Sequence, residues 1–254
     1  MLKDIYLGLK FAFSYFTILP ISFSDNEDLT KSNIIKSLLF FLPFVGLVLG
    51  LITIFVYHLL EHLDWLGAII SAIVYMLLYG FLHTEAIVDV ADALYAKHSG
   101  KDDEEVYKII KEPTIGAMGL LYGTIFVIAK TSVIVYTLLH GYFYELVLVL
   151  MFSRLAIVFN IMIFKSHSNS SFIALMKSNI SSLFLAFTLL FYIAFYSVVM
   201  MNFDFVLFCM VGIFFISTIT IKWIKSHLGF VNGDVIGTSL ELSEVIGLIM
   251  ILSF

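Results

Sequence analysis

Three carboxylates recur at helical spacing in the first half of the chain. Glu85, Asp89 and Asp92 occupy positions i, i+4 and i+7, so a helix would carry all three on one face. Carboxylates this close repel one another unless a cation neutralises them, and their hard oxygen atoms suit Mg²⁺, Mn²⁺ or Ca²⁺. A solvated helix face would also account for them. We predict that this acidic stripe binds a divalent metal, with the solvated face as the alternative.

A second acidic stripe lies near the C-terminal end. Its members stand at i, i+3, i+7 and i+10: Asp234, Gly237, Glu241 and Glu244. Glu241 and Glu244 would each cost several kcal/mol if they faced lipid, so they should face a polar interior. We predict that they add metal ligands beside the first stripe, so that both stripes form one site. Structural salt bridges to Lys130 and Arg154, the two basic residues expected inside spans, are the alternative.

These groups favour phosphoryl transfer. Acidic residues can hold divalent cations that neutralise a diphosphate while a hydroxyl attacks. A cation-coupled transporter would also use membrane carboxylates, but transporters place them near the midplane, whereas the first stripe follows the end of an apolar run. The glycines of the turn 116–119 would let backbone N–H groups approach phosphate.

The composition places these groups in a membrane protein. Hydrophobic residues make up 61% and charged residues 13% of the 254 residues, and the mean hydropathy is +1.05, far from ordinary globular usage. A single cysteine, Cys209, excludes a disulfide framework and a zinc–thiolate site. With no repeat or boundary visible, residues 1–254 are expected to form one membrane-embedded catalytic domain.

The elements that position the stripes are expected to be all-α, in a polytopic bundle of about six to seven spans. Apolar runs predict spans over residues 37–60, 65–82, 120–139, 142–164, 183–201, 205–221 and 235–254. The N-terminal run is too short to span and should be interfacial or re-entrant. Asp102 to Glu105 should open a short amphipathic helix on the cytoplasmic side, ended by Pro113. Residues 165–182 are expected to be a polar loop.

Lysine placement predicts the orientation. Alternating spans put every loop lysine on one side, and the opposite loops around 61–64, 140–141 and 202–204 contain none. The positive-inside rule makes the lysine side cytoplasmic. The lysines concerned are Lys3, Lys10, Lys31, Lys36, Lys97, Lys101, Lys108, Lys111, Lys165, Lys177, Lys222 and Lys225. Both acidic stripes should therefore open toward the cytoplasm.

Two motifs resemble those of a known family. Residues 80–93, GFLHTEAIVDVADA, resemble the His-Leu-Asp-Gly-Leu-Ala-Asp-Thr-x-Asp-Gly signature of the cobalamin synthases. Residues 233–244 are similar to the family's C-terminal Gly-Asp-x-x-Gly-Ala-x-x-Glu-x-x-Glu. Further similarities follow in order at 16–20, 43–46 and 115–119. Glu85 replaces a family Asp, Ala86 and Ala93 replace glycines, and Thr114 stands where many members carry Arg, for which Lys111 is a candidate substitute.

The resemblance implies an Mg²⁺-dependent transferase in the bacterial inner membrane that joins adenosylcobinamide-GDP to α-ribazole, or its 5′-phosphate, and releases GMP. It implies catalytic roles for His83, Asp89 and Asp92; metal ligation by Glu85, Asp89, Asp92, Asp234, Glu241 and Glu244; and substrate binding by Lys111, Gly116, Gly119, Lys130, Gly233 and Gly237. For His83 a helix-end hydrogen bond is the alternative role, and for Lys130 an ion pair with a glutamate. The lipid bilayer is an expected partner, nucleic acid is not, and a homo-oligomer is compatible with this function.

Two other functions remain open on the residues alone. A CDP-alcohol-type membrane phosphotransferase should carry an Asp-Gly-x-x-Ala-Arg motif, which this sequence lacks. A cation-coupled transporter should move an ion in sealed vesicles without consuming a nucleotide.

Overall fold

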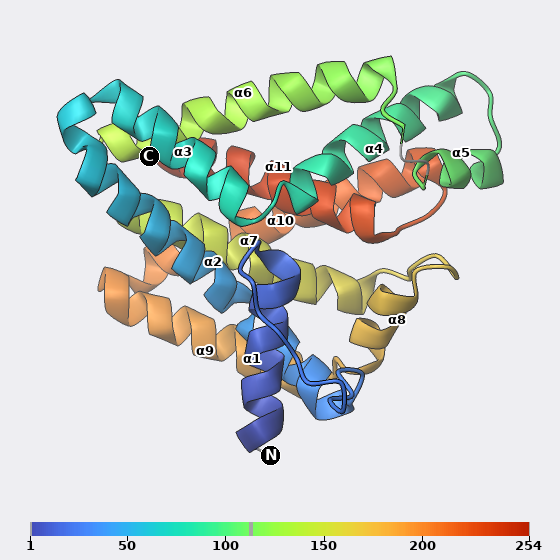
Figure 1. The fold of residues 1–254 in the computed structure, drawn as a ribbon, viewed down its shortest axis with the longest axis horizontal. Helices are drawn as coiled ribbons and strands as arrows, with labels where there is room; N and C mark the ends of the chain where they lie inside the picture. Colours follow the sequence, from blue (N-terminus) through green and yellow to red (C-terminus); the bar gives the residue numbers. More distant parts are fainter. Residues whose placement is uncertain (1, 112–113, 254) are drawn as a thin grey trace.

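The computed structural model describes residues 2–111 and 114–253, and over these residues the chain is helical and contains no strand. Figure 1 shows the arrangement. In chain order the elements are α1 (Leu2–Phe16), α2 (Ser32–Leu60), the 3₁₀ helix η1 (Glu61–Leu63), α3 (Trp65–Leu78), α4 (Leu82–His98), α5 (Asp103–Ile109), α6 (Ala117–Leu139), α7 (Phe143–Ile163), α8 (Ser171–Ser178), α9 (Ser182–Met200), α10 (Phe203–Leu228) and α11 (Gly233–Leu252).

Among the described residues, six helices are long and apolar enough to cross a membrane: α2, α6, α7, α9, α10 and α11. The bent pair α3 and α4 would make a seventh. The predicted helical membrane bundle is therefore confirmed. α7 lies at its centre and is buried on all faces, which explains why its sequence is apolar all round.

The expected span 65–82 differs from the structure. It is interrupted at Tyr79–Phe81, and α4 leaves α3 at 80°. The cause is local, because Gly80 (φ 64°) and Phe81 (φ 54°) both adopt left-handed backbone conformations that end a right-handed helix. The bend directs α4, with its carboxylates, away from the line of α3.

Small residues bring the helices close. A side chain at Gly46 would collide with the backbone carbonyl of Leu150, so α2 lies directly against α7 at this point. A Cβ at Gly237 would lie 3.0 Å from the Cβ of Ala86. α11 therefore lies against the first turns of α4.

The short helices differ in how well they were predicted. α5 forms as expected with Asp102 as its N-cap, whereas Pro113, its expected end, lies outside the described residues. The expected loop 165–182 contains α8, because Ile173 and Met176 are buried on one face. α1 is not among the candidate spans and runs across the direction of α7 and α9 (Figure 1).

Several lysine-bearing segments gather at one end of the molecule. In Figure 1, α5, α8 and the α10–α11 connection lie at the same end, and the α2–α3 turn lies at the other. This arrangement agrees with the lysine distribution along the chain.

Candidate active site

The first acidic stripe lies on α4, as its spacing predicted. Glu85 is exposed, while Asp89 and Asp92 are half-buried. Glu85 and Asp89 line a cavity of about 700 Å³ together with residues 110–111 and 114–115, which lie between α5 and α6. Asp92 lines a smaller neighbouring cavity of about 230 Å³, which Asp89 also borders.

Asp234, at the start of α11, lines the same 700 Å³ cavity, which we call the acidic cavity. Its carboxylate accepts hydrogen bonds from the Lys111 ammonium at 3.1 Å and from the Asn232 amide at 2.7 Å. Asn232 is fully buried and also caps α11 by accepting from the Val235 N–H. The cap therefore fixes the position of Asp234.

The acidic cavity brings together like charges with one cation. Asp234 and Glu85 act electrostatically on the carboxylate of Asp89, and Lys111 opposes them. The two sequence motifs are therefore neighbours in the fold, as predicted. Among residues 2–111 and 114–253, no three His, Cys, Asp or Glu side chains form a ready-made metal cluster.

The glycine turn before α6 is held by Asp92. The carboxylate of Asp92 accepts the Gly116 and Gly119 N–H groups at 2.7 Å each. The sequence analysis expected these N–H groups to face a phosphate. In the structure they donate to the Asp92 carboxylate instead, so they are not available to a phosphate. A side chain on either glycine would collide with this carboxylate, which explains why glycine stands at both positions.

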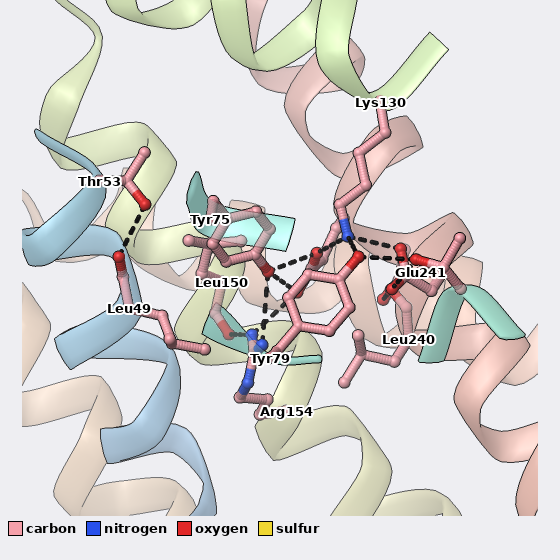
Figure 2. Close-up of polar contacts among 12 residues, drawn as sticks. Leu49, Thr53, Tyr75, Tyr79, Lys130, Leu150, Arg154, Leu240 and Glu241 are labelled. Atoms are coloured by element: carbon pink, nitrogen blue, oxygen red, sulfur yellow. Dashed lines mark hydrogen bonds and ion pairs between the residues drawn. The ribbon is translucent and has the colours of Figure 1, made fainter. Parts of the chain in front are cut away.

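Glu241 and Glu244 do not line the acidic cavity but lie buried deeper along α11, so the prediction that they are metal ligands is corrected. Both share a helix face with Asp234, but Glu241 stands seven residues later, a rise of about 10 Å along the axis. Both carboxylates are at most 1% exposed and form ion pairs with buried cations (Figure 2). The alternative of structural salt bridges is therefore what the structure shows.

Lys130 lies at the centre of this buried cluster. Its ammonium is 2.5 Å from Glu241 and 2.7 Å from Glu244, and Arg154 binds Glu244 at 2.8 Å. Lys130 is 1% exposed, so its surroundings favour the ion pair over substrate contact. Two cations and two anions balance, which a membrane interior requires.

Hydroxyl groups connect this cluster to the bend between α3 and α4. Tyr75 donates to Glu244, Thr84 donates to Glu241, and Tyr79 shares a hydrogen bond with Thr84. The sequence analysis did not identify these residues. Tyr75 and Tyr79 at i and i+4 in an apolar run were the available signal.

His83 lies on the other side of α4, in a second cavity of about 130 Å³ that also contains Asp234, Gly233 and Gly237. The expected helix-end hydrogen bond is not formed within the described part of the chain. Tyr15 and Phe172 border this cavity as well. Partial desolvation and the neighbouring Asp234 charge raise the pKa of the Tyr15 hydroxyl above its usual range, so it stays a donor at neutral pH.

Comparison with known proteins gives relatives along the whole chain. A family model described as cobalamin-5-phosphate synthase matches residues 8–252. A protein of Thermodesulfovibrio yellowstonii named adenosylcobinamide-GDP ribazoletransferase is 26% identical, over 95% of this chain and 94% of the relative. One of the same name from Picrophilus torridus is 28% identical over 96% and 97%. Another from Clostridium perfringens is 29% identical over 47% of this chain and 46% of its own length. The comparison with solved structures found no match.

Proposed function

This chain belongs to the cobalamin-5-phosphate synthase family, and we infer that it is a membrane transferase that joins adenosylcobinamide-GDP to α-ribazole, or to its 5′-phosphate, with release of GMP. The observation that carries this inference is that Asp89 and Asp234, from motifs far apart in sequence, line one cavity with Lys111. With a divalent cation held between its carboxylates, this cavity would accept a charged diphosphate. The two alternatives, a CDP-alcohol phosphotransferase and a transporter, have no support in the family match.

The acidic cavity fits Mg²⁺, which we propose as the cofactor. Mg²⁺ is usually held by one or two carboxylates, with substrate phosphates and water completing its shell, so a ready-made cluster of three side chains is not needed. Asp89 and Asp234 are the two residues we propose to hold it, and the carboxylate of Glu85 adds negative charge to the same cavity. When bound, the metal would neutralise the diphosphate. Lys111, exposed at the rim of this cavity, would bind phosphate oxygen in place of the missing family arginine.

The reaction then needs only positioning and charge stabilisation from the protein. A ribose hydroxyl of α-ribazole attacks the phosphorus next to the cobinamide; the new O–P bond forms as the bond to GMP breaks. The proton of the hydroxyl passes to a carboxylate of the acidic cavity. We propose Asp92 as a positioning residue, because its carboxylate holds the glycine turn against the cavity wall.

We further propose that this site faces the cytoplasm of a bacterial inner membrane. The lysine distribution and the common location of α5, α8 and the α10–α11 connection support this orientation (Figure 1). Nucleotide substrates and Mg²⁺ are available on that side.

Incubation of the purified protein with adenosylcobinamide-GDP, α-ribazole and Mg²⁺ tests the function, with adenosylcobalamin and GMP measured together. We expect equal amounts of both products. Asp89→Asn and Asp234→Asn should each reduce turnover at least about 100-fold, because each removes a charge that would hold the metal. Asp204→Asn, at an exposed position in the first turn of α10, is the matched control. Full turnover in both cavity variants would remove the acidic cavity from the mechanism.

A further inference from the structure

The second cavity has the lining of a binding site for a flat ring. It lies between α1, α4, α7, α8 and α11, and Tyr15, Phe16 and Phe172 contribute three aromatic rings. The rings of Tyr15 and Phe172 lie 4.7 Å apart, and those of Phe16 and His83 lie 5.8 Å apart. Aliphatic side chains of α7 and α8 form much of the remaining wall. We call this space the aromatic cavity.

His83 gives the aromatic cavity an unused polar group. The side chain is 7% exposed and lines the cavity. Across residues 2–111 and 114–253, its ring nitrogens form no hydrogen bond; its neighbours are the rings of Phe16 and Tyr79 and the backbone of Gly237. Buried polar groups are nearly always paired, because desolvation without a partner is costly. A bound ligand atom would complete this hydrogen bond.

The aromatic cavity adjoins the acidic cavity. Leu82, Ala86 and Asp234 line both. A ligand whose ring occupied the aromatic cavity could therefore extend a polar end past Asp234 toward the diphosphate site. An acceptor nucleoside needs two adjoining spaces of this kind: one holds its base, and the other places its ribose hydroxyl at the reacting phosphorus.

We propose that the aromatic cavity binds the benzimidazole base of α-ribazole, with His83 donating to its free ring nitrogen; this proposal rests on the proposed function. The base is flat, largely apolar and has one acceptor nitrogen, which matches three aromatic rings and one unpaired imidazole. Guanine, the other base in the reaction, carries several donors and acceptors that this apolar lining would leave unpaired. A cavity of about 150 Å³ accommodates benzene, so about 130 Å³ encloses roughly one ring of the bicyclic base.

Three variants alter the aromatic cavity in different ways. Phe172→Ala removes a stacking surface. Gly233→Ala narrows the cavity without a clash, since the added Cβ would have its nearest neighbour, Ile173, at 4.0 Å. His83→Leu removes the imidazole but keeps the apolar packing. Phe187→Ala, on the exposed face of α9, is the control.

Equilibrium dialysis with α-ribazole and with GMP, together with steady-state kinetics, tests the proposal. We expect each cavity variant to weaken α-ribazole binding and raise its KM at least about tenfold, with GMP binding and the KM for adenosylcobinamide-GDP unchanged. His83→Leu should keep or raise the melting temperature, because it removes an unpaired buried group; a structural histidine would give the opposite shift.

The outcomes separate this proposal from the proposed function. Turnover with an unchanged KM for α-ribazole in the cavity variants overturns the aromatic cavity as its site and leaves the function standing. Weaker GMP binding with intact α-ribazole binding assigns the cavity to guanine and also overturns the proposal. A wild-type protein that neither turns over nor binds α-ribazole contradicts both.

Discussion

Replacing Lys130 with methionine should destabilise the protein strongly. The ammonium is 1% exposed and lies within 2.7 Å of both Glu241 and Glu244. Glu244 would keep Arg154, but Glu241 would lose its cation and keep the weaker Thr84 hydrogen bond at 3.2 Å. Removing one partner of a buried ion pair lowers the free energy of unfolding by about 3–5 kcal/mol, because the other charge stays buried without a partner. At about 2–4 °C per kcal/mol, the melting temperature should fall by roughly 6–20 °C.

A double variant separates charge balance from other roles of Lys130. Lys130→Met with Glu241→Met removes the pair together and should recover most of the loss, because a buried pair replaced by apolar side chains is often neutral. Lys165→Met, at an exposed position, is the control. Thermal unfolding in detergent or nanodiscs gives the melting temperatures. The reasoning is refuted if Lys130→Met melts within about 2 °C of wild type, or if the double variant is no better than the single.

Three further predictions concern the bend, the glycine turn and the topology. Gly80→Ala should cost about 1–3 kcal/mol, since φ is 64° there, and an unchanged melting temperature would argue against a strained bend. Asp92→Asn should lower stability by about 1–2 kcal/mol through weaker bonding to two backbone N–H groups and should also reduce turnover; loss of neither would contradict its positioning role. In a Cys209→Ser background, Ser99→Cys and Ser170→Cys should react with impermeant maleimides only from the cytoplasmic side, and periplasmic labelling of either would overturn the orientation.

Helical periodicity was enough to predict the main elements. The stripe containing Glu85 and Asp89 lies on a helix, because its place on one face follows from local spacing. The bend at Gly80 was not predicted, since hydropathy continues through it and carries no information about the sign of φ. α8 was missed because burial of Ile173 is a tertiary effect.

The candidate site was predicted in part, because periodicity gives the face of a helix but not the depth along it. Asp234 and Glu241 share a face of α11, yet one lies at the acidic cavity and the other in the buried cluster. The two carboxylates differ in the cation that each contacts: Asp234 pairs with Lys111, and Glu241 pairs with Lys130. These partners come from other parts of the chain, Lys111 from the segment after α5 and Lys130 from α6, and one sequence does not reveal which segments will pack together.

The buried cluster also bears on how the protein is made. Lys130 and Glu241 are 111 positions apart, so at about 5–20 residues per second the lysine leaves the ribosome roughly 5–20 s before its counterion. During that interval α6 carries an unpaired ammonium, at an insertion cost of about 2.5–3.5 kcal/mol near the bilayer centre. α11 is synthesised after α6, and its arrival both neutralises Lys130 and brings Asp234 to α4. Insertion of α11 is thus the event that couples pairing of Lys130 to formation of the acidic cavity, and a nascent chain stopped before α11 has neither.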